Sequence, residues 1–224
     1  MAVEMRARNI NILIACEESQ AICKAFRERG FNSYSCDIQP CRKRDGHPEW
    51  HIQDDVSPYL AGETEFSTMD GKRHKLAKWH LIIAHPPCTY ISKAGSTSMF
   101  PKGKLNQERY RLMLDAVRFF YECYNAKADY VAVENPIPLK IAQLPRPSFY
   151  IQPYWFGERY SKKTYWWCKN LPPIMPTIIN PDHTSIMKKR GCAKERSKTL
   201  TLVAKEYARQ WGDYILEDYN HAHK

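Results

Sequence analysis

The stretch NILIACEESQAICKAFRERGFNSYSCDI, which covers residues 11–38, decides the fold. It opens on the apolar run Asn11–Cys16, which is typical of a strand buried on both faces. The apolar side chains that follow lie on one helical face, and Gly30 is a natural helix end. Phe31–Ile38 then reads as a second strand. A strand, a helix and a strand in about 30 residues form a βαβ unit, which predicts a parallel sheet.

Beyond this unit, strands and helices continue to alternate. Trp79–His85 reads as a strand that two prolines end, Asn106–Ala126 as a long helix and Asp129–Glu134 as another strand. Residues 39–58 are polar and read as irregular, and Ser92–Lys104 reads as a mobile loop. The alternation predicts an α/β fold with a doubly wound, mostly parallel sheet.

A proline-rich region, residues 136–198, departs from this alternation. Its prolines forbid long helices and predict loops and short strands. A helical period returns over residues 199–212, and we expect that helix to pack back on the sheet while the tail after Gly212 frays. The sequence therefore predicts a single domain over residues 1–224, with its core at residues 9–135.

The composition excludes several classes of protein. The chain has 224 residues, of which 43% are hydrophobic and 26% charged, as in an ordinary globular protein. No apolar run approaches the roughly 20 residues of a membrane span, and the first residues lack the apolar stretch of a signal peptide. Membrane, collagen-like, coiled-coil and largely disordered proteins are excluded, and we expect a cytoplasmic location without a membrane partner.

The charge balance favours a nucleic-acid partner. There are 34 Lys and Arg against 24 Asp and Glu, a net charge of +10, and 12% of the residues are aromatic. Cations can hold phosphates while rings stack on bases, although solvated basic faces and an aromatic core would give the same composition. Trp166 and Trp167 fit core packing better than base stacking. Two groups of cations are candidates for phosphate contacts: Lys93, Lys102, Lys104, Arg109 and Arg111, and Lys188, Lys189, Arg190, Lys194, Arg196 and Lys198.

The eight cysteines form no Cys-x-x-Cys pair. Without a secretory signal, reduced thiols are expected, most of them small buried side chains. Cys168, His183 and Cys192 match no standard zinc spacing, so no metal is expected.

Chemistry-bearing residues follow the predicted strands, where ligands bind in parallel α/β sheets. Asp37 ends the second strand, where an acidic residue commonly binds a ribose diol, although a solvated turn residue is the alternative. Cys88 follows two prolines after the third strand, and Glu134 ends the next. A thiolate is a strong nucleophile, and a thiolate beside a carboxylic acid suits addition to an electron-poor pyrimidine ring. His85 is a further candidate, either as a proton shuttle or as a strand-end residue.

The pairing of HPPC (residues 85–88) with ENP (residues 134–136), each after an apolar strand, resembles the DNA cytosine-5 methyltransferases. The wording HPPCTY followed by IS, together with SKKT and RS-x-T, is similar to the short phage and prophage members. The likeness runs from Asn11 to Gly212. It implies a Rossmann-like class I S-adenosylmethionine-dependent methyltransferase fold with a reduced proline-rich and aromatic recognition segment, DNA as partner, and a bacterial host cell if the protein is phage-encoded.

The resemblance also implies the site residues. Cys88 would attack C6 of a flipped cytosine, Glu134 would contact N3 and N4, and a lysine in place of the family's arginine would polarise the carbonyl. The implied catalytic residues are Cys88, Glu134 and Lys163. The implied residues around S-adenosylmethionine are Cys16, Glu17, Glu18, Asp37, Ile38, Asp55, Val56 and Pro86. The implied substrate contacts are Ser92, Asn135, Lys162, Thr164 and Arg196.

Two features depart from the family pattern. The loop after the first strand reads ACEESQ without the family's glycines, so Glu17 or Glu18 is expected to meet the cofactor's ammonium group. The segment Tyr165–Glu195 is too short for a typical recognition domain. We therefore expect that the recognised DNA sequence is short, that the specificity is low, or that another chain supplies the specificity. An amino-methyltransferase, a methyltransferase of free pyrimidine nucleotides and a catalytically decayed nucleic-acid-binding protein stay open, as does the oligomeric state.

Overall fold

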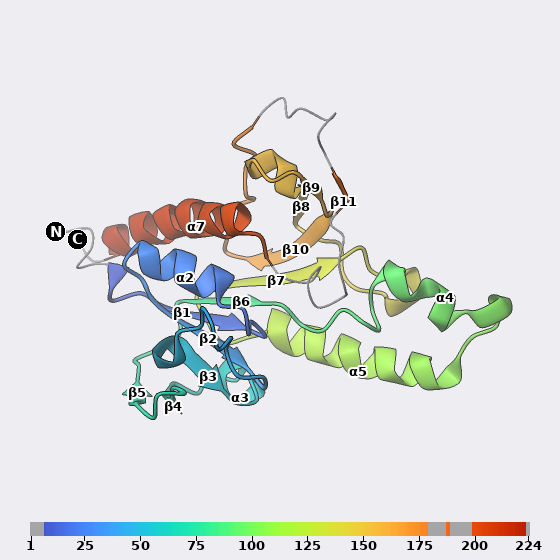
Figure 1. The fold of residues 1–224 in the computed structure, drawn as a ribbon, viewed down its shortest axis with the longest axis horizontal. Coiled ribbons are helices and arrows are strands. Elements are labelled where there is room, and N and C mark those ends of the chain that lie inside the picture. Colours follow the sequence, from blue (N-terminus) through green and yellow to red (C-terminus); the bar gives the residue numbers. More distant parts are fainter. Residues whose placement is uncertain (1–6, 179–186, 189–198, 223–224) are drawn as a thin grey trace.

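A computed structural model describes residues 7–178, 187–188 and 199–222. Its centre is a seven-stranded sheet in the order β3-β2-β1-β6-β7-β10-β8 (Figure 1). Neighbours from β3 to β7 pair in parallel, whereas β10 is antiparallel to both β7 and β8. The bounds of these strands are β1 Asn11–Ala15, β2 Asn32–Asp37, β3 His51–Gln53, β6 Leu81–Ala84, β7 Tyr130–Pro136, β8 Phe149–Ile151 and β10 Thr164–Lys169.

Helices cover both faces of the sheet, which makes the fold doubly wound (Figure 1). On one face α2 (Ala21–Glu28) packs beside α7 (Thr201–Ala222), and on the other face lie α3 (Ser57–Leu60) and α5 (Gln107–Tyr124). The α/β class with a mostly parallel sheet is therefore confirmed. Because side chains alternate along a strand, successive residues of β6 and β7 belong to different cores.

The long α5 and α7 have identifiable local causes. The side chain of Asn106 accepts a hydrogen bond from the backbone N–H of Arg109 and caps the start of α5. In α7 the apolar period continues past Gly212 to Ile215 and Leu216, both buried. A Cβ at Gly212 would come within 2.8 Å of the Phe31 ring, so this glycine permits close packing and does not end the helix. The prediction that the tail frays after Gly212 is wrong.

Several short elements lie where the sequence predicted irregular chain. Residues 39–58 contain β3, and Ser92–Lys104 folds into short helical turns beside α5. The proline-rich region forms loops and short strands, as predicted, within its described part. The remaining elements are β4 Glu65–Ser67, β5 Arg73–Lys75, β9 Tyr160–Ser161, β11 Met187–Lys188, α4 Ser96–Met99, η1 Pro48–Trp50, η2 Lys93–Gly95, η3 Pro101–Gly103, η4 Lys140–Ala142 and η5 Pro153–Phe156.

Trp166 and Trp167 are both buried, which confirms their expected place in the core. They project to opposite faces of β10, Trp166 toward α7 and Trp167 toward α5. The two tryptophans therefore anchor the antiparallel strand to both helical layers and are not available to stack on a base.

Candidate functional site

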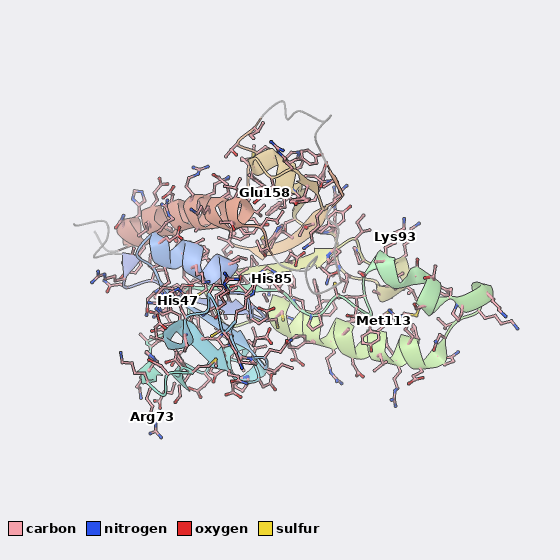
Figure 2. All side chains as sticks on the ribbon, viewed as in Figure 1. His47, Arg73, His85, Lys93, Met113 and Glu158 are labelled. Carbon is pink, nitrogen blue, oxygen red and sulfur yellow. The ribbon has the colours of Figure 1, made fainter. Side chains whose placement is uncertain are left out.

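The strand order brings three polar side chains together at the carboxyl edge of the sheet. Glu17, His85 and Glu134 follow or end β1, β6 and β7, which are consecutive neighbours. His85 continues the alternation of β6 and faces the α2–α7 layer, as does Glu134 in β7. In Figure 2, His85 lies near the centre of the molecule, where the strands end.

Glu134 is a largely buried carboxylate held by two cationic or protonatable side chains. Its Oε2 lies 3.2 Å from His85 Nδ1. Burial would raise the pKa of Glu134, but the charge of Lys162 and the hydrogen bond with His85 outweigh burial and lower that pKa. Oε1 is buried and has no hydrogen-bond partner among the described residues. The carboxylate is therefore fixed through one oxygen, while the other is buried and lacks a hydrogen-bond partner among the described residues.

Cys88 shares this environment. Burial raises the pKa of its thiol, and the negative charge of Glu134 adds to that effect. The charge of Lys162 and a hydrogen bond with the Ser92 side chain act in the opposite direction. Sulfur, carboxylate and ammonium group are thus within electrostatic reach of one another at one edge of the sheet.

The loop that carries Cys88 is braced on both sides. The backbone N–H of Ser92 donates to the carbonyl of Cys88 at 2.9 Å, and Ser92 itself is buried. The guanidinium of Arg109 donates to the carbonyl of Thr89 at 2.7 Å and lies over the Tyr90 ring. Arg109 is a candidate for a phosphate contact in the sequence; in the structure it holds the loop that carries Cys88, a role that sequence spacing did not reveal.

The pair Lys162 and Lys163 separates in space. Lys162 lines a small cavity with Glu134, whereas the Lys163 ammonium lies 3.9 Å from the centroid of the Tyr150 ring. Lys162 therefore takes the place beside Glu134 that was expected for Lys163, and the role expected of Lys163 is now expected of Lys162. Thr164 lines the same cavity as Lys162 and is buried, with its hydroxyl bonded to the Lys162 carbonyl.

Asn135 lies where a substrate cannot touch it in this conformation. It is 0% exposed, and neighbouring Val133 places this side of β7 in the core under α5, away from Glu134. Both polar atoms of its side chain are without a hydrogen-bond partner among the described residues. The expected substrate contact at Asn135 is not supported by this position.

The cavity beside Glu134 measures about 20 Å³. Room of this size accommodates about one water molecule. The side chains of His85, Lys162, Thr164, Trp166 and Tyr207 contribute to its wall. A pyrimidine ring cannot fit inside a cavity of this size, so a base would have to be bound outside it.

The opposite half of the edge carries the expected cofactor residues. The ends of β1, β2 and β3 carry Cys16, Asp37 and Asp55. Burial is the main cause that raises the pKa of the Cys16 thiol, and the charges of Asp37 and Asp55 add to it, so the three groups interact through space. Ile38, which follows Asp37, is an apolar side chain with 75% exposure, whereas Val56, which follows Asp55, is buried. Pro86, at the end of β6, is buried as well.

The loop after β1 is built without glycine. Cys16 and Gln20 adopt left-handed backbone conformations, with φ of 61° and 56°, at positions where glycine is the usual residue. The buried Gln20 amide donates to the carbonyl of His47 at 3.0 Å and accepts from its N–H at 2.7 Å. Side-chain hydrogen bonds thus hold a turn that glycines provide in the family pattern.

Glu17 is turned inward. It is 5% exposed, and its carboxylate accepts hydrogen bonds from the backbone N–H groups of Ile22 and Cys23 at the start of α2. Glu18 lies 3.5 Å from the guanidinium of Arg42. The expectation that Glu17 meets the cofactor's ammonium group is therefore not supported, because its oxygens already satisfy the helix.

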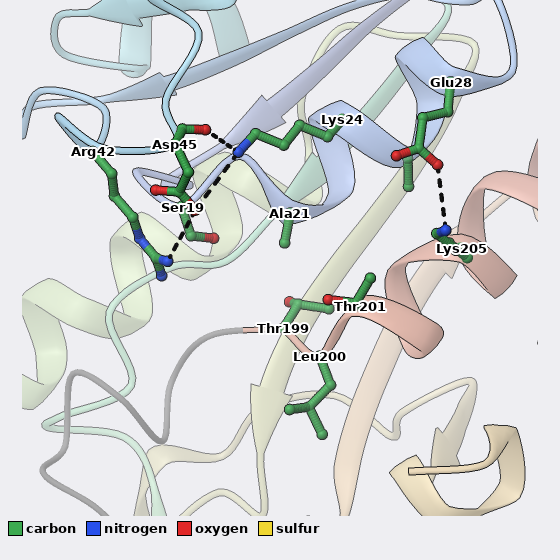
Figure 3. Close-up of a pocket in the computed structure, with 11 residues that line it drawn as sticks. Ser19, Ala21, Lys24, Glu28, Arg42, Asp45, Thr199, Leu200, Thr201 and Lys205 are labelled. Carbon is green, nitrogen blue, oxygen red and sulfur yellow. Dashed lines mark hydrogen bonds and ion pairs between the residues drawn. The ribbon is translucent and has the colours of Figure 1, made fainter.

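A larger cavity of about 350 Å³ lies between α2 and the start of α7 (Figure 3) and shares Thr199 and Leu200 with the small cavity beside Glu134. Its charged groups pair with one another: Lys24 binds Asp45, and Lys205 lies 3.6 Å from Glu28. Of its lining residues, Thr199 ends the stretch 196–199, which resembles the family's closing motif at the border of the cofactor, and the others were not predicted to bind substrate or cofactor. Size alone does not mark the site.

The two predicted groups of basic residues differ in how much of each the structure describes. Lys93, Lys102, Lys104 and Arg111 are exposed around α4 and the start of α5, with Lys93 visible in Figure 2. Of the second group, Lys189, Arg190, Lys194, Arg196 and Lys198 lie outside the described residues, as do His183 and Cys192.

Within the described ranges, the cysteines are free thiols, and no three His, Cys, Asp or Glu side chains gather in a way that could hold a metal ion. No helix in that part of the chain is both long and apolar enough to cross a bilayer. In comparisons with known proteins, no protein-family model matches the chain and no curated protein matches it.

Proposed function

We propose that this protein transfers a methyl group from S-adenosylmethionine to C5 of a cytosine in DNA through a covalent Cys88 adduct. The observation that carries the proposal is the shared environment of Cys88, Glu134 and Lys162 at the carboxyl edge of the sheet. A nucleophilic sulfur, a carboxyl group and a cation are the three groups that addition to a pyrimidine ring requires.

The strand order supports the proposal independently of the sequence motif. Among the strands of the large sheet, the last in the chain, β10, is inserted antiparallel between the fifth, β7, and the sixth, β8. This insertion is the arrangement of the class I S-adenosylmethionine-dependent methyltransferases, the fold class that the sequence resemblance implies. A fold alone does not determine an activity, so this argument stands second to the site.

The open half of the edge fits an adenosyl group. Asp37 accepts a hydrogen bond from the backbone of Gln39 through one oxygen, and its position at the end of β2 suits a ribose diol. Ile38 offers an exposed apolar side chain to a purine face, and the exposed Asp55 follows β3. When bound, the cofactor supplies an electrophilic methyl group.

The residues of the chain would perform the addition in a balanced sequence. The sulfur of Cys88 forms a bond to C6 of cytosine, and the proton lost by the thiol is matched by one gained at N3. The unpartnered Oε1 of Glu134 can carry that proton, because Oε2 is held by His85. Lys162 stabilises the charge that develops on the ring carbonyl. After methyl transfer, the C5 proton passes to solvent, the Cys88 sulfur leaves C6 as a thiolate, and the proton on N3 returns to that thiolate through Glu134, which restores the aromatic ring.

The test is covalent trapping on a duplex that contains 5-fluorocytosine, with S-adenosylmethionine present. Fluorine at C5 cannot leave as the proton does, so the adduct persists and migrates as a protein–DNA complex under denaturing conditions. We expect trapping by the wild type and none by Cys88→Ser. Cys168→Ser is the matched control, because Cys168 is a free thiol that lines neither cavity.

Nucleoside mass spectrometry with labelled cofactor identifies the product. 5-Methylcytosine in DNA supports the proposal, whereas N4-methylcytosine or N6-methyladenine contradicts it. Methylation of deoxycytidine monophosphate but not of DNA would move the activity to free nucleotides. DNA binding without methylation or cofactor binding would favour a decayed enzyme.

A further inference from the structure

His85 is anchored in both its backbone and its ring. Its backbone N–H donates to the carbonyl of Ala15 at 3.0 Å, which extends the pairing of β6 with β1. Pro86 follows and fixes the chain direction. The ring packs edge-on against Trp166, with centroids 6.0 Å apart and planes at 79°. An imidazole held in this way keeps one orientation.

The ring lies between two buried acids. Nδ1 meets Glu134 Oε2 at 3.2 Å, and the charge of Glu17 is within reach from the other neighbouring strand end. Nε2 is buried without a hydrogen-bond partner among the described residues. Burial raises the pKa of Glu17 to about 7, although the charge of His85 lowers it. Glu17 therefore changes its ionisation near neutral pH, next to the imidazole.

The other charged or titratable groups that face this cluster come from several elements. Glu18, the next residue in the chain, and Cys23, in α2, interact through space with Glu17. Lys162, just before β10, lowers the pKa of Glu134. Tyr207, in α7, has a raised pKa because it is buried and because it lies near the charge of Glu134. Cys88 completes the surroundings. The charge of Lys162 and the hydrogen bond with His85 favour an ionised Glu134 in the free protein, and its unpartnered oxygen then needs a fixed direction to act on a ring nitrogen.

We propose that His85 is a positioning residue that aims the free oxygen of Glu134 at the substrate and couples this carboxylate to Glu17 across three neighbouring strand ends. This inference rests on the proposed function. It assigns to His85 no contact with substrate or cofactor, only the orientation and ionisation of Glu134.

The first test compares three proteins in single-turnover trapping on 5-fluorocytosine DNA. His85→Phe keeps a ring of similar shape but cannot donate a hydrogen bond, and we expect its trapping rate to fall about 10- to 150-fold, the value of a hydrogen bond to a charged group. His85→Asn keeps a donor near Nδ1 and should recover most of that rate. Urea midpoints of both variants report whether the fold is intact.

The second test is the pH profile of the trapping rate between pH 5.5 and pH 9. We expect the wild type to show an ionisation near pH 7 that Glu17→Gln removes and that His85→Phe uncouples from the trapping rate. Equal rates and equal profiles in wild type, His85→Phe and Glu17→Gln would overturn the role of His85 alone. A wild type that traps no DNA overturns the proposed function, and the role of His85 falls with it.

Discussion

The two halves of the sheet's carboxyl edge differ in burial and in what their charged groups contact. In the open half, at the ends of β2 and β3, Asp37 and Asp55 accept hydrogen bonds from nearby backbone N–H groups, and Ile38 is exposed. In the buried half, His85 and Glu134 are side chains with about 14% and 13% exposure that bind each other.

We expect this difference in burial to separate the residues that hold a ligand from the residues that take part in the reaction. Groups that hold a ligand can remain solvated, because a partly exposed hydrogen bond still provides orientation. Groups that transfer a proton or attack a ring act more strongly where water is excluded, because charges interact over a lower dielectric. The halves therefore predict different consequences when one group is changed: loss of rate in the buried half and loss of affinity in the open half.

The largest effect is expected at Glu134. Glu134→Gln keeps the shape of the side chain but cannot transfer a proton to the ring, and general acid–base catalysis contributes about 10²- to 10⁴-fold. We expect the trapping rate to fall by that factor with little change in cofactor affinity, measured by calorimetry. A fall in affinity with an unchanged rate would assign Glu134 to the holding half.

A smaller effect is expected from Lys162, with its neighbour Lys163 as the matched control. Lys162→Met removes a charge that faces Glu134 and the substrate carbonyl, so trapping should slow about 10- to 150-fold. Lys163→Met removes contacts with the Tyr150 and Tyr165 rings, and its rate should stay within about fivefold of the wild type. Equal losses in both variants would show that general positive charge, and not position, matters.

In the open half, Asp37→Asn tests ligand holding. An amide still accepts a hydrogen bond but lacks the charge that makes such bonds about twice as strong, so cofactor affinity should fall about 3- to 10-fold. Calorimetric titration with S-adenosylmethionine measures it, and trapping at saturating cofactor should match the wild type. Asp45→Asn, at the other cavity, controls for the loss of one acid. Unchanged affinity would remove Asp37 from the cofactor site.

A further effect concerns stability and pH, not activity. The folded pKa of Glu17, about 7, lies above its ordinary value of 4.5, so the stability that this group contributes is full below pH 4.5 and is lost as pH rises through 7. Relative to Glu17→Gln, the wild type should therefore lose unfolding free energy between pH 4.5 and pH 8. Urea unfolding at four pH values measures this, and a difference that stays constant with pH would contradict it.

Much of the fold could be predicted from the sequence because β1, β6 and the first part of β7 are short apolar runs, although β2, which reads NSYSCD, is mostly polar. β1, β2, β6 and β7 lie within their predicted ranges, apart from two residues at the end of β7. β3 was missed because it has three residues and one of them is exposed, so it shows no apolar run. The prediction that the helix ends at Gly212 was wrong because a glycine that allows close packing looks the same in sequence as one that ends a helix.

The site was harder to predict than the fold, since side-chain direction depends on register and contacts. Consecutive lysines at positions 162 and 163 are equivalent in sequence, and only the path of the chain into β10 separates them. Glu17 looked available because its role as the cap of α2 depends on a turn with left-handed residues that sequence did not predict. His85 could be named as a candidate, but its partner came from the adjacency of β6 and β7.

The hydrogen bonds between Gln20 and His47 have a consequence for binding. Glycines in a loop leave many conformations open, and a ligand that orders such a loop loses part of its binding energy to that ordering. Here the loop after β1 gives up its freedom when the chain folds, so a small molecule entering the edge meets a rigid wall. The affinity for a ligand then depends on how well the ligand matches a shape that already exists, which favours selectivity for one ligand over adaptation to several.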